Sequence, residues 1–264
     1  MTTRRGTVTL ETLLRRDRVV VGVALLIVVT LSWAYLAHMA LLEPDADVNA
    51  GAMALAPAQP WSAGYFAVML VMWVVMMVGM MIPSAAPTIL LFSALQRKIG
   101  SGPRESFSGS GFFTAGYMAD WTSFSVVATF AQWALGEAAL LSSTMTSASP
   151  ILGGILFIAA GLYQLTPLKN ACLAHCRAPA QFLVRRWRAG RFGGFIMGLE
   201  HGAFCIGCCW VLMALLFTFG VMNLLWIAAI TVFIFVEKLA PAGAQFGRAS
   251  AALMLGVGAY LLIF

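Results

Sequence analysis

The stretch "GGFIMGLEHGAFCIGCCWVLMALLFT", residues 193–218, has the length and apolarity of a membrane-crossing helix, yet it contains side chains that bind metals. An apolar run of about 20 residues spans the hydrocarbon core of a bilayer. Gly194, Gly198 and Gly202 recur every four residues, and such a ridge of small residues lets another helix approach closely. We therefore predict a membrane-embedded helix that packs tightly against a neighbour.

The rest of the chain has the composition of a polytopic membrane protein. It is 61% hydrophobic and 10% charged, whereas a soluble domain has about 25% charged residues. Six further apolar segments cover residues 19–42, 62–82 (continuing past two prolines to about 95), 110–135, 149–167, 221–238 and 247–264. We predict an all-α fold, a bundle of about seven transmembrane helices, with residues 1–18 as a cytoplasmic segment and 19–264 as a single transmembrane domain. Because proline removes a backbone donor, the second helix should bend or end near Pro83 and Pro87.

The basic residues predict the orientation of this bundle. All sixteen Lys and Arg lie in four segments, 1–18, 96–105, 169–191 and 238–248. Cytoplasmic loops of membrane proteins are enriched in Lys and Arg, which places the N-terminus and these segments in the cytoplasm. The net charge of +6 is then a topology signal, and we expect no nucleic-acid partner.

One face of the helix over 193–218 carries a candidate metal site. At about 100° per residue, His201, Cys205, Cys208 and Cys209 share this face, and Glu200 lies about 100° from His201. Thiolate and imidazole ligands suit soft or borderline metals, with Cu(I) and Zn(II) as the leading cases. Glu200 is costly inside a membrane, and could serve as a ligand, a proton acceptor or the counter-ion of a buried base. Buried cysteines that only pack as small apolar residues are the alternative.

A methionine stripe on the second helix is the next candidate ligand set. Its members, six methionines in thirteen residues, are Met69, Met72, Met76, Met77, Met80 and Met81. Thioethers bind Cu(I) but are poor ligands for Zn(II), so the stripe favours copper. Methionine also packs well in apolar cores, which is the alternative explanation.

A third group follows the fourth helix, at the predicted cytoplasmic face. Cys172 and Cys176 are four residues apart in "YQLTPLKNACLAHCRAP", with His175 between them. These residues could form a port that exchanges metal with the cytosol, or a redox-active dithiol. Their spacing is not the C-x-x-C of thioredoxin-like enzymes.

Taken together, four segments resemble the bacterial family of predicted metal-binding integral membrane proteins, described as copper-chaperone-like. They are "MMVGMMIPS" (76–84), "YQLTPLKNACLAHCRAP" (163–179), "GLEHGAFCIGCCWVLM" (198–213) and "VEKLAP" (236–241). The resemblance implies metal binding and a metal-handling role. The positions that match without departure are Met80, Met81, Pro83, Lys169, Cys172, Cys176, Cys205, Cys208, Cys209 and Trp210.

The leading hypothesis is a protein that transports, stores or delivers Cu(I), with Zn(II) as a possible ion. Its partners would be the metal ion, the lipid bilayer and a soluble metallochaperone or client metalloenzyme. The sequence has no Walker motif and no D-K-T-G-type phosphorylation motif, so ATP-driven pumping is not expected. We expect no enzymatic activity, with a redox role as the alternative. The main alternative is a transmembrane thiol–disulfide electron carrier. Haem ligation by His201 and a methionine, and a purely structural subunit, are further alternatives.

Overall fold

The computed structural model describes residues 10–42, 61–99, 102–141, 149–240 and 243–263, and over these residues the all-α prediction is confirmed. The helices are α1 (Leu10–Leu42), α3 (Ala63–Lys98), α4 (Pro103–Glu137), α5 (Pro150–Leu165), α6 (Pro167–Arg177), α7 (Pro179–Arg185), α8 (Gly190–Ala214), α9 (Leu216–Phe219), α10 (Leu224–Leu239) and α11 (Gly243–Ile263). Each of the seven predicted apolar segments coincides with a helix. The predicted cytoplasmic segment 1–18 lies outside the described residues up to position 9, and α1 begins within it.

Four helical stretches are long and apolar enough to cross a membrane. They are Arg18–Leu41, Ala63–Lys98, Gly190–Phe219 and Gln245–Ile263, and a fifth is added if α5 and α6, bent by 66°, form one broken span. The helices α5 and α10 have 16 residues each, or about 24 Å, at about 1.5 Å per residue. Length and composition therefore identify four or five spans among the described residues.

The long helix α4 contains several polar residues, and some of their side chains are buried in the protein interior. Ser110, Ser125 and Thr129 are buried and donate to main-chain carbonyls four residues earlier, at 2.8 Å each. Gln132 accepts a hydrogen bond of 2.7 Å from the buried indole of Trp73 on α3. Each of these side chains has a partner inside the bundle, so their burial is tolerated.

The second helix was expected to bend or end near Pro83 and Pro87, and it does not end there, because α3 continues to Lys98. Pro83 cannot donate to the carbonyl of Gly79, four residues earlier. The indole of Trp33 on α1 donates to that carbonyl instead, at 3.3 Å. A neighbouring helix thus satisfies the oxygen that proline leaves free, as is common in membrane helices.

The glycine ridge of α8 packs closely on α4, as its spacing predicts. A Cβ at Gly198 would collide with the main-chain oxygen of Phe113 and would lie 3.0 Å from the nitrogen of Tyr117. A Cβ at Gly116 would in turn collide with the main-chain oxygen of Phe195. The two backbones therefore touch at positions where only glycine fits, and this contact brings Tyr117 against α8.

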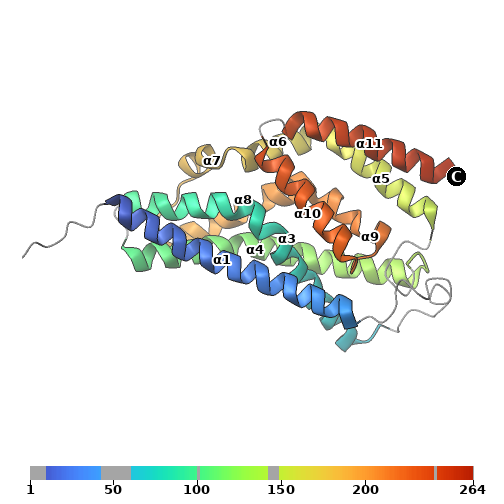
Figure 1. The fold of residues 1–264 in the computed structure, drawn as a ribbon, viewed down its shortest axis with the longest axis horizontal. Coiled ribbons are helices and arrows are strands. Elements are labelled where there is room, and N and C mark those ends of the chain that lie inside the picture. The colour runs from blue at the N-terminus through green and yellow to red at the C-terminus, as the bar shows by residue number, and fades with distance from the viewer. Residues whose placement is uncertain (1–9, 43–60, 100–101, 142–148, 241–242, 264) are drawn as a thin grey trace, which may run out of the picture.

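The remaining helices add to this pair, with α5 and α11 side by side on one side of the molecule (Figure 1). α1 packs along α3, α5 pairs with α11, and α10 contacts α3, α6, α8 and α11. Between α5 and α6 the chain turns at Thr166, whose hydroxyl donates to Tyr163 O at 2.7 Å and accepts from Lys169 N at 3.3 Å. The turn directs α6 across α8, which decides where Cys172 and Cys176 lie.

Candidate metal centre

Three cysteines of α8 form a compact group of sulfur ligands. The ligand atoms of Cys205, Cys208 and Cys209 all lie within 4.8 Å of one another. Each residue is only 1% exposed. Their spacing of three, four and one residues places them on adjacent turns of one helix face. The group can therefore place two or three sulfurs around a single ion.

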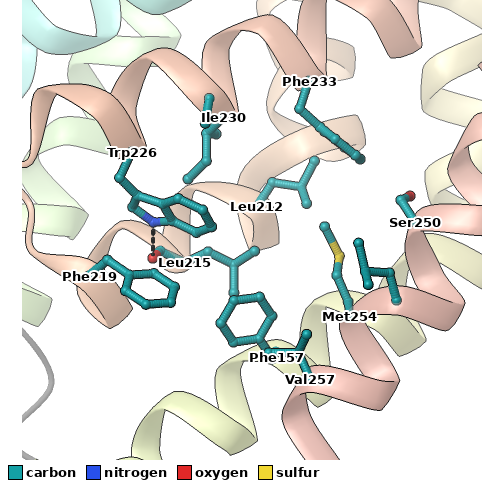
Figure 2. A pocket seen from close by; sticks show the side chains of 12 residues that line it. Phe157, Leu212, Leu215, Phe219, Trp226, Ile230, Phe233, Ser250, Met254 and Val257 are labelled. Carbon is teal, nitrogen blue, oxygen red and sulfur yellow. Dashed lines mark hydrogen bonds between the residues drawn. The ribbon is translucent and has the colours of Figure 1, made fainter.

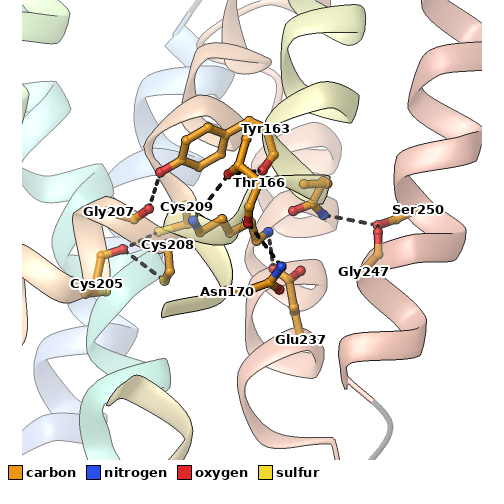
Figure 3. Close-up of polar contacts among 12 residues, drawn as sticks. Tyr163, Thr166, Asn170, Cys205, Gly207, Cys208, Cys209, Glu237, Gly247 and Ser250 are labelled. Atoms are coloured by element: carbon orange, nitrogen blue, oxygen red, sulfur yellow. Dashed lines mark hydrogen bonds and ion pairs between the residues drawn. The ribbon is translucent and has the colours of Figure 1, made fainter. Parts of the chain in front are cut away.

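Main-chain hydrogen bonds hold two of these thiols in position (Figure 3). The thiols of Cys208 and Cys209 each donate to the main-chain oxygen of Cys205, at 3.0 Å. Both side chains therefore turn back toward the preceding helical turn, beside Cys205. This convergence follows from the tilt of helical side chains toward the N-terminus.

The sulfur of Cys205 has two polar partners from other helices. Lys238 Nζ on α10 lies 2.9 Å from Cys205 Sγ, and the hydroxyl of Tyr117 on α4 lies 3.0 Å from it. Lys238 also donates to Ser84 Oγ on α3, at 3.1 Å. A buried ammonium stabilises negative charge on the sulfur that it contacts. Residues of α3, α4, α8 and α10 therefore meet at Cys205.

The helix α6 brings the two remaining cysteines to the same place. Cys176 is buried and lies close enough to interact with the thiols of Cys205 and Cys208. Cys172 is partly exposed, and its sulfur lies against Gly207, where an added Cβ would be 2.7 Å away. All five cysteines of the chain are free. The two cysteine groups of the sequence thus form one sulfur-rich region that reaches from the surface to the buried cluster.

Glu200 and His201, on the N-terminal side of this cluster, have other neighbours. Glu200 accepts hydrogen bonds from Arg188 at 2.8 Å and from Arg186 at 3.5 Å, so the structure does not bring it to the sulfurs. His201 is buried at 2% exposed, among aromatic rings that include Tyr117 and Phe182. Its Nδ1 has no hydrogen-bond partner among the described residues. His201 shares Tyr117 with Cys205, so it lies near the cluster.

His175 is likewise separate from the sulfur cluster. Its ring stacks flat on Phe204, with 4.0 Å between the ring centroids, and its Nδ1 lies 2.8 Å from the main-chain oxygen of Ala171. The side chain is exposed. The structure therefore places His175 at the surface of α6, stacked on Phe204 of α8.

The methionine stripe of α3 is entirely buried. The side chains of Met69, Met72, Met76, Met77, Met80 and Met81 are at most 5% exposed. The C-terminal end of the stripe meets the cysteine region, because Tyr117 OH, which contacts Cys205, also donates to the main-chain oxygen of Met81 at 3.3 Å. At the other end, Gln132 Nε2 donates to the sulfur of Met69 at 3.6 Å. The stripe therefore runs through the core and ends beside the cluster.

The polar residues around Cys205, most of all Lys238, were not predicted from the sequence. Lys169 and Lys238 were counted among the basic residues that indicate topology, and the structure places both inside the protein, at 1% and 5% exposed. Lys169 forms an ion pair of 2.7 Å with Glu237. The sequence did contain a signal for the burial of these charges, because Glu237 and Lys238 follow directly on the apolar run of α10.

A separate cavity of about 370 Å³ lies between α5, α8, α10 and α11 (Figure 2). Its walls are apolar, and they include Phe157, Leu212 and Met254. The polar groups at its edge are engaged: Trp226 Nε1 donates to Leu215 O at 2.8 Å, and Ser250 donates to a main-chain oxygen. The chemistry of a metal site therefore lies with the cysteines and not with this cavity.

Comparison with known proteins identifies a family whose model matches most of the chain. A family model described as "PpoB2: Copper chaperone" matches residues 70–261, which include the methionine stripe from Met72 onward and all five cysteines. No curated protein and no solved structure matches the chain.

Proposed function

Because the chain belongs to the PpoB2 copper chaperone family, we propose that it is an integral membrane protein that binds Cu(I) and passes it to a partner. Cys205 and one of its neighbours, Cys208 or Cys209, hold the ion as two thiolates, and Cys176 is the next ligand. The observation that carries this proposal is the cluster of three buried sulfurs within 4.8 Å. Copper is the cargo of this site, and the chain catalyses no reaction on it.

The ligand chemistry supports a soft ion. Thiolate sulfur selects Cu(I) among the common cellular metals, with Zn(II) as the main competitor. The methionines add a further preference for Cu(I), because thioethers bind Zn(II) poorly. We propose that Met72, Met76, Met77, Met80 and Met81 offer weak sites along α3, which end beside the cysteines.

The cysteines of α6 give the ion a route to the surface. Cys172 is partly exposed, whereas Cys176 is buried beside Cys205 and Cys208. An ion could pass from Cys172 to Cys176 and then to Cys205 by exchanging one thiolate at a time. The donor or acceptor at Cys172 would be a soluble metallochaperone or client metalloenzyme.

We propose that the chain crosses the bacterial inner membrane and that α6 faces the cytoplasm. The four or five apolar helices support membrane insertion, and the basic residues support a cytoplasmic N-terminus. Seven crossings require that α4, α5 and α10 also span. The polar interior of α4 is compatible with this, because its polar groups bond within the bundle.

The test is Cu(I) titration of detergent-purified protein under reducing conditions, in competition with a chromogenic Cu(I) chelator. The wild type should retain one high-affinity Cu(I), and Cys205→Ser should lose it. Cys172→Ser is the matched control, and should keep the affinity but slow the transfer of copper to the chelator. A wild-type protein with no copper affinity, or a Cys205→Ser variant with unchanged affinity, would refute the proposal.

The alternative, a thiol–disulfide electron carrier, is also supported by the close approach of three free thiols. Two thiols would be oxidised to one disulfide, with two electrons and two protons passed to a partner disulfide. Alkylation of cysteines in intact cells distinguishes the two functions. A disulfide between Cys205 and Cys208 that cycles in growing cells would favour the carrier, whereas reduced thiols protected by copper favour the chaperone.

A further inference from the structure

We propose that Lys238 makes the copper site selective for monovalent cations. Its ammonium contacts Cys205 Sγ and cancels the negative charge that a singly charged ion leaves on two thiolates. This inference rests on the proposed function and adds to it the charge of the ion that the site accepts.

The geometry isolates Lys238 from other anionic partners. The ammonium is buried and has two partners, Cys205 Sγ at 2.9 Å and Ser84 Oγ at 3.1 Å. The adjacent Glu237 binds Lys169 instead, at 2.7 Å. No carboxylate contacts Lys238 in the described part of the chain. The sulfur of Cys205 is therefore the group whose negative charge the ammonium balances.

A charge balance shows which ions this arrangement favours. When a monovalent ion binds two thiolates, two metal–sulfur bonds form, any thiol proton is lost to solvent, and the complex keeps one negative charge. The positive charge of the Lys238 ammonium brings the total charge of the site to zero. A divalent ion in the same two-sulfur geometry gives a neutral complex, and Lys238 then leaves one uncompensated positive charge. Burial of an unpaired charge is strongly unfavourable, so the monovalent ion is preferred.

The second partner of Cys205 does not alter this balance. The hydroxyl of Tyr117 donates or accepts a hydrogen bond at 3.0 Å without adding charge. The other nearby thiols add no positive charge: Cys208 and Cys209 donate to a main-chain oxygen, and Cys176 on α6 interacts with Cys205 and Cys208. The fixed cation at the site is therefore the ammonium on α10, and a change of its charge should change ion selectivity.

The test compares two soft ions that both favour linear two-thiolate coordination but differ in charge, Ag(I) and Hg(II). Affinities of the detergent-purified full chain are measured by chelator competition. Lys238→Met should lower the Ag(I):Hg(II) affinity ratio by about ten- to hundredfold, as expected when a charge-assisted hydrogen bond is lost. Lys238→Arg, which keeps the charge, should restore most of the ratio.

Two further variants keep the test decisive if Lys238→Met does not fold. Lys238→Gln removes the charge but keeps a hydrogen-bonding side chain, and should shift the ratio in the same direction as Lys238→Met. The double variant Lys169→Met/Glu237→Gln removes the neighbouring ion pair without changing net charge, and should leave the ratio unchanged. Folding is checked by helicity and thermal unfolding.

The outcomes separate this inference from the proposed function. If the wild type binds neither Cu(I) nor Ag(I), the proposed function fails. If the wild type binds both ions, but the neutral Lys238 variants keep the wild-type Ag(I):Hg(II) ratio, the inference about Lys238 is overturned while copper binding stands.

Discussion

The close contact between α4 and α8 predicts a strong effect of a single methyl group at Gly198. In Gly198→Ala the new Cβ would overlap the main-chain oxygen of Phe113 and lie 3.0 Å from the nitrogen of Tyr117. Main-chain atoms cannot move aside as a flexible side chain can, so the two helices must separate. Tyr117 contacts Cys205 at 3.0 Å, and that hydrogen bond would lengthen as α4 moves.

The expected magnitude follows from two opposing terms. Overpacking a well-packed interface costs about 1–3 kcal/mol, and here the overlap is with main chain, which places the cost at the upper end. Alanine in place of glycine inside a helix recovers about 0.5–1 kcal/mol. We expect a net loss of about 2–2.5 kcal/mol, and a Tm lower by about 2–4 °C per kcal/mol for a chain of this size.

The assay is thermal unfolding in detergent, paired with Cu(I) competition. Gly111→Ala is the matched control, because Gly111 lies on α4 and an added Cβ there meets nothing within 4 Å. This control should be as stable as the wild type or slightly more stable, and should bind copper normally. Equal Tm values for Gly198→Ala and Gly111→Ala would show that the helices do not touch as described.

Three other changes test separate contacts. Met76→Leu should weaken Cu(I) binding but spare Zn(II), and cost less than about 1.5 kcal/mol of stability; equal weakening of both ions would assign the stripe to packing. Lys169→Met should cost about 3–5 kcal/mol by thermal unfolding, because it leaves Glu237 buried without its ion pair, and Glu237→Gln in the same chain should recover most of this loss. Trp33→Phe should cost about 1–3 kcal/mol by leaving the carbonyl of Gly79 without a donor; an unchanged Tm would mean that this hydrogen bond contributes nothing to α3.

Sequence periodicity predicted the helices and the shared face of the α8 cysteines because both depend on local geometry. A hydrophobic run fixes the existence of a helix, and an angle of about 100° per residue fixes which side chains share a face. The same reasoning correctly identified the glycines of α8 as a site of close helix approach. These features depend on one helix at a time.

The composition of the site could not be predicted from one helix, because it depends on how the helices meet. The bend at Thr166 folds α6 over α8, so that Cys176 joins Cys205 although 29 positions separate them in the sequence. The partner of Glu200 is Arg188, which sequence spacing alone does not reveal. Lys238 was assigned to a cytoplasmic segment because such segments are enriched in lysine and arginine, whereas the structure places it inside the bundle against the sulfur of Cys205.

The ion's ligand set is the most direct test of a copper site built from the cysteines of α8 and α6. X-ray absorption at the copper edge, on protein loaded with one Cu(I) under reducing conditions, reports which atoms are bonded to the ion. We predict a first coordination sphere made only of sulfur in the wild type, and we predict that Cys205→Ser, which loses the high-affinity site, does not hold the ion in this sphere. A wild-type spectrum dominated by nitrogen or oxygen ligands, and unchanged in Cys205→Ser, would contradict the assignment of copper to this cluster.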